Sequence, residues 1–307
     1  MKKLIYGSYL IIACLASSCD KDNLALEMLP TPKLNVQDSL AMIDIYKMGN
    51  LGKWGYEGEY WDPTNFKTWE CIRYKLDSLT NEYRITELHI YASTAQLTDT
   101  NCIISPRIAD LSELRLLQLV GLGIEGELPQ GVSKLKNLIH LEIVRTNLSG
   151  SLPDDLFNSS FERVAIADNL SLTGPLPSSI VLLRSIPSQT EFHIGRNAFT
   201  GKIPPGIQAN IALESNNLTE YPFEYLDIEN TSYGGIRKLR HNKISGIIPD
   251  YILNDPFLIH RLWERVYPQQ EGYGYTNMPP FEKIENDYQI YLKNKMNNNR
   301  SDINNSF

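Results

Sequence analysis

Apolar residues recur through the middle of the chain in a pattern that returns at a fixed spacing. One copy places them at Leu111, Leu114, Leu117, Leu119, Ile124, Leu128, Val132 and Leu135, and the next copy continues from Leu135. Within each copy a short segment alternates apolar and variable residues, which is the period of a strand with one buried face. Each copy therefore predicts one strand followed by a longer return segment.

A short phrase built on glycine and proline follows each of these strands. Five such phrases occur, at residues 126–129, 150–153, 174–177, 201–204 and 246–249, and the first three prolines are 24 residues apart. Glycine lets the chain turn where a β-carbon would clash, and proline favours an extended segment outside the sheet. A period of this length is typical of a solenoid, in which no repeat can bury its apolar face alone.

The pattern resembles the plant-type leucine-rich repeat, LxxLxxLxLxxNxLxGxIPxxIxxL, over residues 85–253. The resemblance implies an α/β repeat fold: a right-handed solenoid with a parallel β-sheet on its concave face, short 3-10 or extended segments on its convex side, and a helical N-terminal cap. In this family the concave surface binds proteins, peptides or glycans. The resemblance therefore favours a binding protein, and an enzyme is the least favoured class.

The asparagine of the repeat is present in four copies, as Asn169, Asn197, Asn216 and Asn242. Its amide is expected to satisfy backbone groups of the adjacent coil, as buried turns require. Thr146 could partly replace it in the preceding copy, whereas Leu122 could not. The spacing becomes irregular after Pro177, so the later coils are expected to be the least regular.

The sequence divides into six stretches: a signal peptide (1–18), a linker (19–36), an N-terminal cap (37–84), the solenoid (85–255), a C-terminal cap (256–292) and a disordered tail (293–307). The first cap is predicted from a helical pattern and from three tryptophans that would form its core: Trp54, Trp61 and Trp69. The paired cap cysteines of the family are not reproduced. Cys71 and Cys102 could form a disulfide or could be independent buried thiols.

The first residues predict export. Two lysines precede an apolar stretch that is too short to span a bilayer, and small residues then lead to Cys19. This resembles a bacterial lipoprotein signal, with fatty acyl chains such as palmitate on Cys19. The acidic stretch at 20–22 resembles the signal that sends lipoproteins of Bacteroidetes-like bacteria to the cell surface. We expect an outer-membrane lipoprotein held only by its lipid; an ordinary secretory peptide with an accidental cysteine is the alternative.

Composition and motifs limit the classes of partner that the chain is expected to bind. Removing residues 1–18 removes two lysines, so the formal net charge falls from −7 to −9. Such an acidic chain is a poor nonspecific ligand for nucleic acid or an anionic bilayer. The sequence has no metalloprotease, phosphate-loop or serine-nucleophile motif, and its histidines lack metal-ligand spacing. We predict no catalytic residue, no metal, no cofactor and no nucleic-acid partner.

Candidate ligand-binding residues occupy the variable positions that follow the buried leucines on the strands. They are Glu87, His89, Tyr91, Gln118, His140, Glu142, Arg145, Arg163, Asp168, Glu191, His193, Arg196, Glu214, Lys238 and Arg240. Three of them, Arg145, Arg163 and Arg196, are expected to form one ridge across successive coils, where guanidinium groups can pair with carboxylates.

Two binding hypotheses follow. In the first, the concave face of a surface-anchored protein recognises a protein or peptide. In the second, the chain is an accessory glycan-binding lipoprotein of a carbohydrate-uptake system. Its platform would be the aromatic stretch after the last coil, which includes Tyr273 and Tyr275.

Overall fold

The computed structural model describes residues 31–54, 65–92, 101–184, 192–225 and 236–304. Nearly all of them belong to one compact unit that begins at Pro32. The predicted signal peptide, Cys19 and the acidic stretch at 20–22 lie outside the described residues, as do Trp61 and Glu191.

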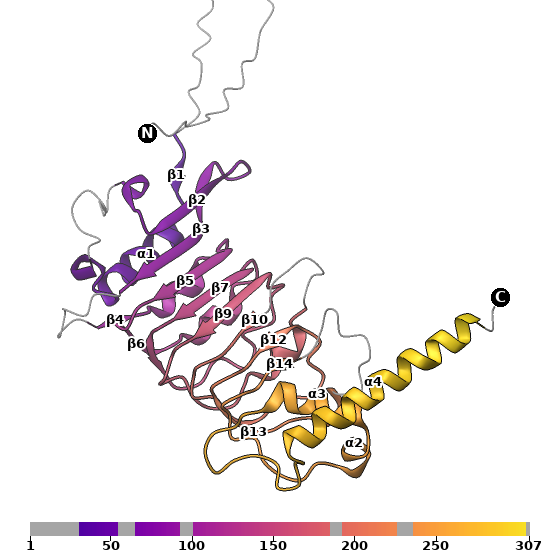
Figure 1. Cartoon of the computed structure of the whole chain (residues 1–307). Coiled ribbons are helices and arrows are strands. Elements are labelled where there is room, and N and C mark those ends of the chain that lie inside the picture. Colours follow the sequence, from indigo (N-terminus) through magenta and orange to yellow (C-terminus); the bar gives the residue numbers. More distant parts are fainter. Residues whose placement is uncertain (1–30, 55–64, 93–100, 185–191, 226–235, 305–307) are drawn as a thin grey trace, which may run out of the picture. The chain divides into compact units, whose positions relative to one another are not determined.

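The main sheet contains nine strands, and most of them are parallel neighbours from successive coils (Figure 1). In spatial order they are β1 (Lys33–Leu34), β3 (Glu82–Tyr91), β5 (Leu116–Val120), β7 (His140–Val144), β9 (Arg163–Ala167), β10 (Phe192–His193), β12 (Ile211–Ala212) and β14 (Ile236–Lys238). Strand β2 (Ile72–Asp77) pairs antiparallel with β3. This is the parallel sheet of a leucine-rich-repeat solenoid, as the sequence predicts.

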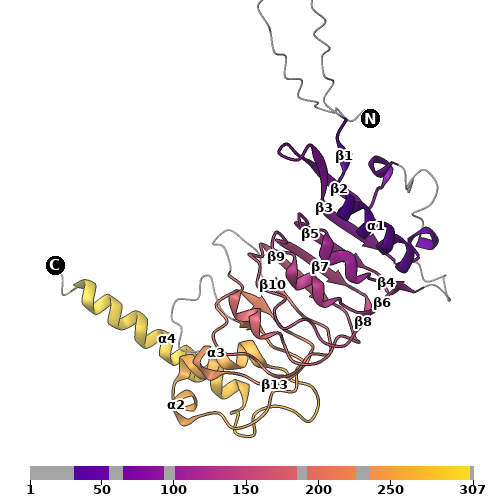
Figure 2. The same cartoon turned by 180° about the vertical axis from the view of Figure 1, so that it is seen from behind.

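The side of the coils opposite the main sheet is built from short segments. Figure 2 shows the molecule from behind. Four of them are 3-10 helices: η4 (Pro106–Asp110), η5 (Gln130–Lys134), η6 (Ser178–Leu182) and η7 (Phe223–Tyr225). Two small parallel sheets also form on the flank, one from β4 (Cys102–Ile103), β6 (Ile124–Glu127) and β8 (Asn147–Ser149), the other from β11 (Thr200–Lys202) and β13 (Asn217–Glu220). The repeat pattern does not predict these small sheets.

A ladder of buried asparagines joins one coil to the next. Asn169 accepts a hydrogen bond from the N–H of Thr146 at 2.9 Å and donates to the carbonyl of Ile143 at 3.0 Å. Asn197, Asn216 and Asn242 likewise donate to a carbonyl of the preceding coil. Thr146 accepts from the N–H of Leu148 in its own coil and donates to the side chain of Asn169. The predicted role of the four asparagines is confirmed, and Leu122 at the equivalent position is 62 % exposed.

The N-terminal cap is built around one ion pair, in which the carboxylate is buried and the guanidinium is half-buried. Helix α1 (Val36–Met48) starts at Asn35, whose side chain accepts from two N–H groups of the first turn. Asp38 on this helix is fully buried and contacts Arg84 of β3 at 3.0 and 3.1 Å, and it also accepts from the N–H of Ile85. Breaking this pair leaves an uncompensated buried charge. The pair therefore fixes the helix against the first strand.

Two short 3-10 helices and two cysteines complete the N-terminal cap. The helices are η1 (Leu51–Trp54) and η3 (Phe66–Thr68). Trp69 is buried as predicted, while the side chain of Trp54 lies outside the described residues. Cys71 and Cys102 are separate buried thiols, and burial raises the pKa of each to about 12. Of the two possibilities left open by the sequence, the structure has the independent thiols.

Three helices close the other end: α2 (Asp250–Leu253), α3 (Pro256–Val266) and α4 (Phe281–Asn304). The edge strand β14 is covered here, because the N–H of Leu239 donates to the carbonyl of Arg265. Gln269 then continues the asparagine ladder: it accepts from the N–H of Ile244 and donates to the carbonyl of Leu239. Asn242 makes the same pair of contacts one coil earlier.

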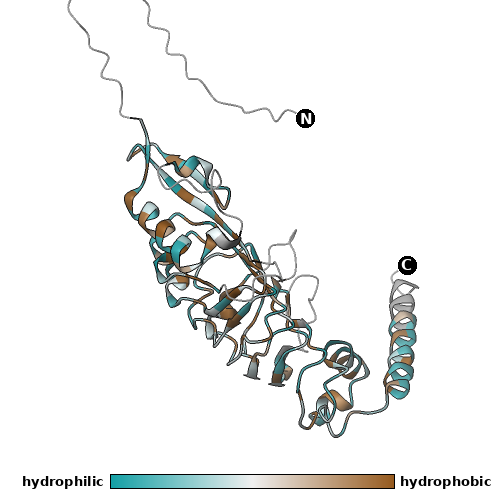
Figure 3. Cartoon of the chain, turned by 90° about the vertical axis from the view of Figure 1, so that its left-hand side faces the viewer, coloured by the Kyte–Doolittle hydropathy of each residue, from teal (hydrophilic) through white to brown (hydrophobic). Residues whose placement is uncertain are grey.

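The predicted disordered tail is wrong as far as Asn304, because α4 continues through it. Aromatic contacts support the helix before residue 293: Tyr288 stacks on His260 at 3.9 Å and lies beside Tyr291. One turn later, the amino group of Lys295 lies over the ring of Tyr291. This i,i+4 contact stabilises the helix beyond residue 293. Figure 3 shows that hydrophilic residues prevail on α4. Among the described helices, none is long and apolar enough to cross a membrane.

Candidate binding surface

The open face of the main sheet, here called the concave face, presents three rows of side chains that cross the strands. One row runs through Glu87, Leu116, His140 and Arg163; a middle row through His89, Gln118, Glu142, Ala165, His193, Ala212 and Lys238; and a third through Tyr91, Val120, Val144 and Ala167. These rows arise because strands in parallel register place equivalent outward residues side by side. Most predicted strand residues therefore do lie on one surface.

Gln118 is the centre of a hydrogen-bonded group in the first three coils. Its amide oxygen accepts from the hydroxyl of Tyr91 at 2.5 Å and lies 2.8 Å from Nδ1 of His89, and its amide nitrogen donates to Glu142 at 2.9 Å. His89 Nε2 lies 3.2 Å from Glu87. Five of the predicted residues are thus linked, which orients their side chains before any ligand arrives.

A hollow of about 170 Å³ lies beside this group on the concave face. Its polar lining comes from Gln118, His140, Glu142 and Arg163, and its apolar lining includes Leu116. His140 is oriented by Glu162, which lies 3.3 Å from its Nε2. The hollow combines apolar floor with hydrogen-bonding groups of both kinds, which is the composition of small recognition sites. Leu116 could have been recognised from sequence as an apolar residue at a variable position.

Small residues mark the middle of the concave face. Ala165, Ala167 and Ala212 replace the larger side chains of the earlier coils. Between Ala165 and Ala212, His193 contacts Glu214 at 3.1 Å. Burial opposes the charged form of Glu214, but the hydrogen bond from His193 and one from its own backbone outweigh burial and lower the pKa of Glu214.

Arg145 and Arg196 lie at the edge of this face rather than on its strands. Arg145 directly follows β7 and Arg196 comes three residues after β10, and both have positive φ, as do Asp168, Ser215 and His241 at the same position of other coils. Arg196 approaches Asp168 at 3.4 Å. Arg163 begins β9 at the opposite edge, where it pairs in register with His140. The predicted ridge of three arginines is therefore wrong: two lie along one edge and one lies across the face.

Charge is unevenly divided along the concave face. The first coils carry Glu87 and Glu142 on their strands. Arg163, Arg196, Lys238 and Arg240 lie toward the C-terminal coils, where the two carboxylates of this face, Asp168 and Glu214, already contact Arg196 and His193. Lys238, Arg240 and Arg163 are exposed. A ligand that matches this surface needs basic groups over the first coils and acidic groups over the later ones.

No group of three potential metal ligands occurs among the described residues. Three histidines of this face, His89, His140 and His193, each contact a carboxylate, as does His260 on α3. The aromatic platform predicted after the last coil includes Tyr273 and Tyr275. Tyr275 is 8 % exposed. Tyr273 is 45 % exposed, and the amino group of Lys243 lies over its ring.

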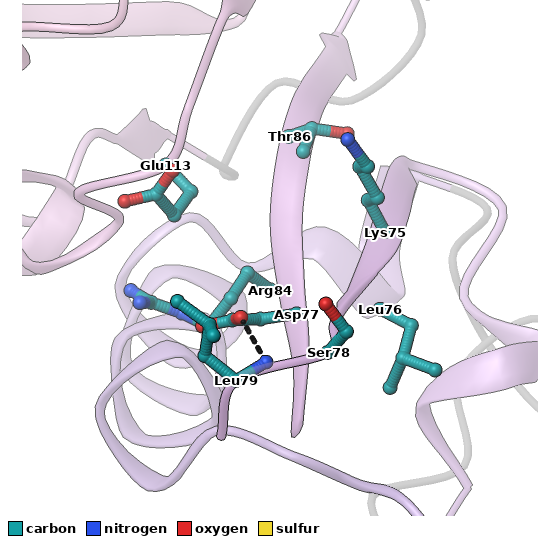
Figure 4. Close-up of a pocket in the computed structure, with 8 residues that line it drawn as sticks. All are labelled: Lys75, Leu76, Asp77, Ser78, Leu79, Arg84, Thr86 and Glu113. Atoms are coloured by element: carbon teal, nitrogen blue, oxygen red, sulfur yellow. Dashed lines mark hydrogen bonds between the residues drawn. The ribbon is translucent and has the colours of Figure 1, made fainter. Parts of the chain in front are cut away.

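A larger hollow of about 380 Å³ lies at the N-terminal cap (Figure 4) and was not anticipated from the sequence. Two of its charged groups are already bonded: Arg84 to Asp38 and Ser112, and Asp77 to the N–H of Leu79 at 2.9 Å. The bond from Leu79 is the main reason for the lowered pKa of Asp77. These contacts fix the hairpin between β2 and β3, so this hollow is explained by the cap itself.

Comparison with known proteins supports the fold. The chain resembles the crystal structure of a plant ice-binding protein with a TM-score of 0.52 and 24 % identity, over 73 % of this chain and 67 % of that one. It also resembles the ectodomain of the receptor kinase SOBIR1 from Arabidopsis thaliana (TM-score 0.40, 22 % identity, 57 % and 88 % of the two chains) and the PEPR1–AtPEP1 complex (0.42, 19 %, 72 % and 36 %). No protein-family model and no curated protein matches the sequence. Likenesses of this size concern the leucine-rich-repeat fold and not the ligand.

Proposed function

We propose that this chain is a non-catalytic recognition protein that binds a protein or peptide through the concave face of its solenoid. The observation that carries the proposal is the hydrogen-bonded group centred on Gln118, which spans three coils beside a hollow lined by Arg163 and His140. Side chains fixed in this way lose little further freedom on binding, so more of the contact energy appears as affinity.

The ligand class follows from the charge division. A peptide or protein segment with basic groups toward one end and acidic groups toward the other can pair with Glu87 and Glu142 on the first coils and with Arg163 and Lys238 on the later coils. Opposed charges of this kind set the direction in which a chain lies and speed its encounter. Arginine also pairs with carboxylates through two parallel hydrogen bonds.

The test is a screen of the purified mature chain against peptide, protein and glycan arrays, followed by affinity measurements on charge-reversal variants. Arg163→Glu and Glu142→Lys should each weaken binding about tenfold or more, because each introduces repulsion at a contact. Glu127→Lys is the matched control, since Glu127 is an exposed carboxylate on β6 of the flanking sheet. Full affinity in both concave-face variants would exclude this surface.

We also propose that the chain is anchored in the outer membrane and displayed at the cell surface. The support is the apolar stretch that ends in small residues before Cys19, followed by the acidic residues 20–22. A single acyl chain anchors only weakly, so the proposal requires more than one chain on Cys19. Cys19→Ala should abolish labelling with a fatty acid and release the protein from membranes.

Surface display has its own test. Alanine at all three positions 20–22 should protect the chain from protease added to intact cells, while lipid labelling continues. A chain without Cys19 that still labels and fractionates with membranes would refute the anchor. Unchanged digestion after replacement of residues 20–22 would refute only the sorting role.

A further inference from the structure

A hollow of about 520 Å³ lies on the flank of the last coils, away from the strands of the concave face. Four parts of the chain form it: the end of β13, the helices η7 and α2, and the C-terminal loop. Figure 1 labels α2 and β13. The lining residues that matter here are Glu220, Tyr221, Phe223, Glu224, Tyr251 and Tyr275. The volume is within the range of sites for small molecules, roughly 300–1,000 Å³.

Aromatic rings form the walls of this hollow and hold one another in place. The ring of Phe223 lies 5.6 Å from that of Tyr275 and 6.1 Å from that of Tyr221. Tyr221 and Tyr275 are buried, whereas Tyr251 on α2 is 51 % exposed. An exposed tyrosine at the edge of a fixed aromatic wall offers a face on which a flat apolar surface can pack.

The hydroxyl of Tyr275 is the second observation. It is buried, it lines the hollow, and it makes no hydrogen bond to the part of the chain that the structure describes. Burial raises the pKa of Tyr275, so the phenol remains protonated and can donate. A buried polar group without a partner is unfavourable and calls for an explanation, such as a group supplied from outside. The backbone of the same residue is fixed, since its N–H donates to Tyr267 at 2.7 Å.

The charges around the hollow select the ligand. Lys202 lies 2.8 Å from Glu220, so this carboxylate already has a cationic neighbour. Arg265 donates to the hydroxyl of Tyr221 at 3.2 Å, so a positive charge already lies behind the wall. A cationic ligand would meet this charge, and an anionic ligand would meet the carboxylates of Glu220 and Glu224. A neutral ligand with many hydroxyl groups avoids both conflicts.

We propose that this hollow binds a pyranose ring of a neutral oligosaccharide. The apolar face of the sugar stacks on Tyr251, the hydroxyl of Tyr275 bonds a sugar oxygen, and the carboxylates of Glu220 and Glu224 accept hydrogen bonds from sugar hydroxyls. The site is separate from the concave face, so neither proposal depends on the other.

The experiment uses saturation-transfer NMR and calorimetry on the purified chain with cello-, malto-, xylo- and manno-oligosaccharides. Oligogalacturonate and the N-acetylated amides of lysine and arginine are the charged probes. At least one neutral oligosaccharide should bind, and Tyr251→Ala should weaken its affinity about tenfold. Tyr273→Ala is the matched control: Tyr273 is also an exposed tyrosine of this end, 45 % against 51 %, but it does not line the hollow.

Tyr275→Phe separates binding from folding, because it removes only the unpartnered hydroxyl. The affinity should fall at least about threefold while the Tm stays equal or rises, since no internal hydrogen bond is lost. A lower Tm would mean that the hydroxyl is bonded within the protein. That result would overturn the proposal. So would the absence of binding by every neutral oligosaccharide, or equal affinity in Tyr251→Ala and wild type. Preferential binding of the lysine or arginine probe would also overturn it.

Discussion

The first and the last coils of this solenoid differ in their sheet but not in their core. Strands β5, β7 and β9 have five residues each and pair in continuous register. Strands β10 and β12 have two residues each, and the register shifts between β12 and β14. The changed spacing after Pro177 predicts this loss of regularity, and the structure confirms it.

The buried positions continue through both regions. Leu141 and Ile143 in the regular part have the same burial as Leu213 and Leu239 in the irregular part, all at 1 % exposure or less. Asn216 and Asn242 continue the hydrogen bonds that Asn169 makes. The comparison shows that a coil is stabilised by its apolar interior and by the side-chain amide of its buried asparagine. A long strand is not required once both are in place.

The largest expected effect tests whether the two cores are equivalent. Leu141→Ala and Leu213→Ala should each lower the free energy of unfolding by roughly 2–5 kcal/mol, because each leaves a cavity in a close-packed interior. Denaturant melts of the two variants measure this. A loss at Leu213 far below that at Leu141 would show that the irregular coils are loosely packed.

Glu142→Ala is the control for the first of these changes, because Glu142 is adjacent to Leu141 but faces outward. The strand pattern alone predicts a change within about 0.5 kcal/mol, as for an exposed site. The hydrogen bond from Gln118 raises the expected loss to about 1 kcal/mol. Equal losses for Leu141→Ala and Glu142→Ala would mean that the strand register is wrong.

A smaller effect concerns the asparagine ladder. Asn169→Ala and Asn216→Ala should each cost about 1–3 kcal/mol in unfolding free energy, because each leaves buried backbone groups without partners. Asn147→Ala is the matched control: its amide donates to the carbonyl of Leu122, but at an exposed position, so the change should stay within about 0.5 kcal/mol. If the control loses as much as Asn169→Ala, burial is not what gives the ladder its importance.

The smallest effect is the pH dependence that Glu214 contributes in the irregular coils. The pKa of Glu214 is lower in the folded chain than its ordinary value of 4.5, so the folded state favours the carboxylate. Its contribution is present above pH 4.5 and is lost as the pH falls through the folded pKa. The stability difference between wild type and Glu214→Gln should therefore shrink by less than about 1 kcal/mol on acidification. Urea melts across this range measure it, and a difference that grows toward low pH would contradict the assignment.

The local spacing of apolar residues determines how much of the fold and of the binding surface can be predicted from the sequence. The repeat phrases fix which residues of a strand face inward, so His89, Gln118 and Glu142 were placed on one face correctly. The positive φ at Arg145 and Arg196 turns these side chains to the edge, and a pattern of apolar residues does not contain that information. The flank hollow was missed because Tyr251 and Tyr275 come from separate segments that meet only in the folded chain.

The caps show the same limit. The pair of Asp38 and Arg84 joins residues far apart in sequence, so the partner of each could not be identified from local pattern. The α4 helix was missed because its polar composition resembles that of a disordered segment, whereas its tyrosines are fixed by contacts with α3. Interactions between distant segments decide both cases.

Gln269 has a consequence for how such a chain can change its length during evolution. It contacts the last coil through the carbonyl of Leu239 and the N–H of Ile244, which are the same two positions that Asn242 contacts one coil earlier. The C-terminal cap therefore recognises the end of a coil without regard to how many coils precede it. Duplication or loss of one 24-residue unit would leave both caps with the neighbours they need, and recognition surfaces of different lengths could arise in single genetic steps.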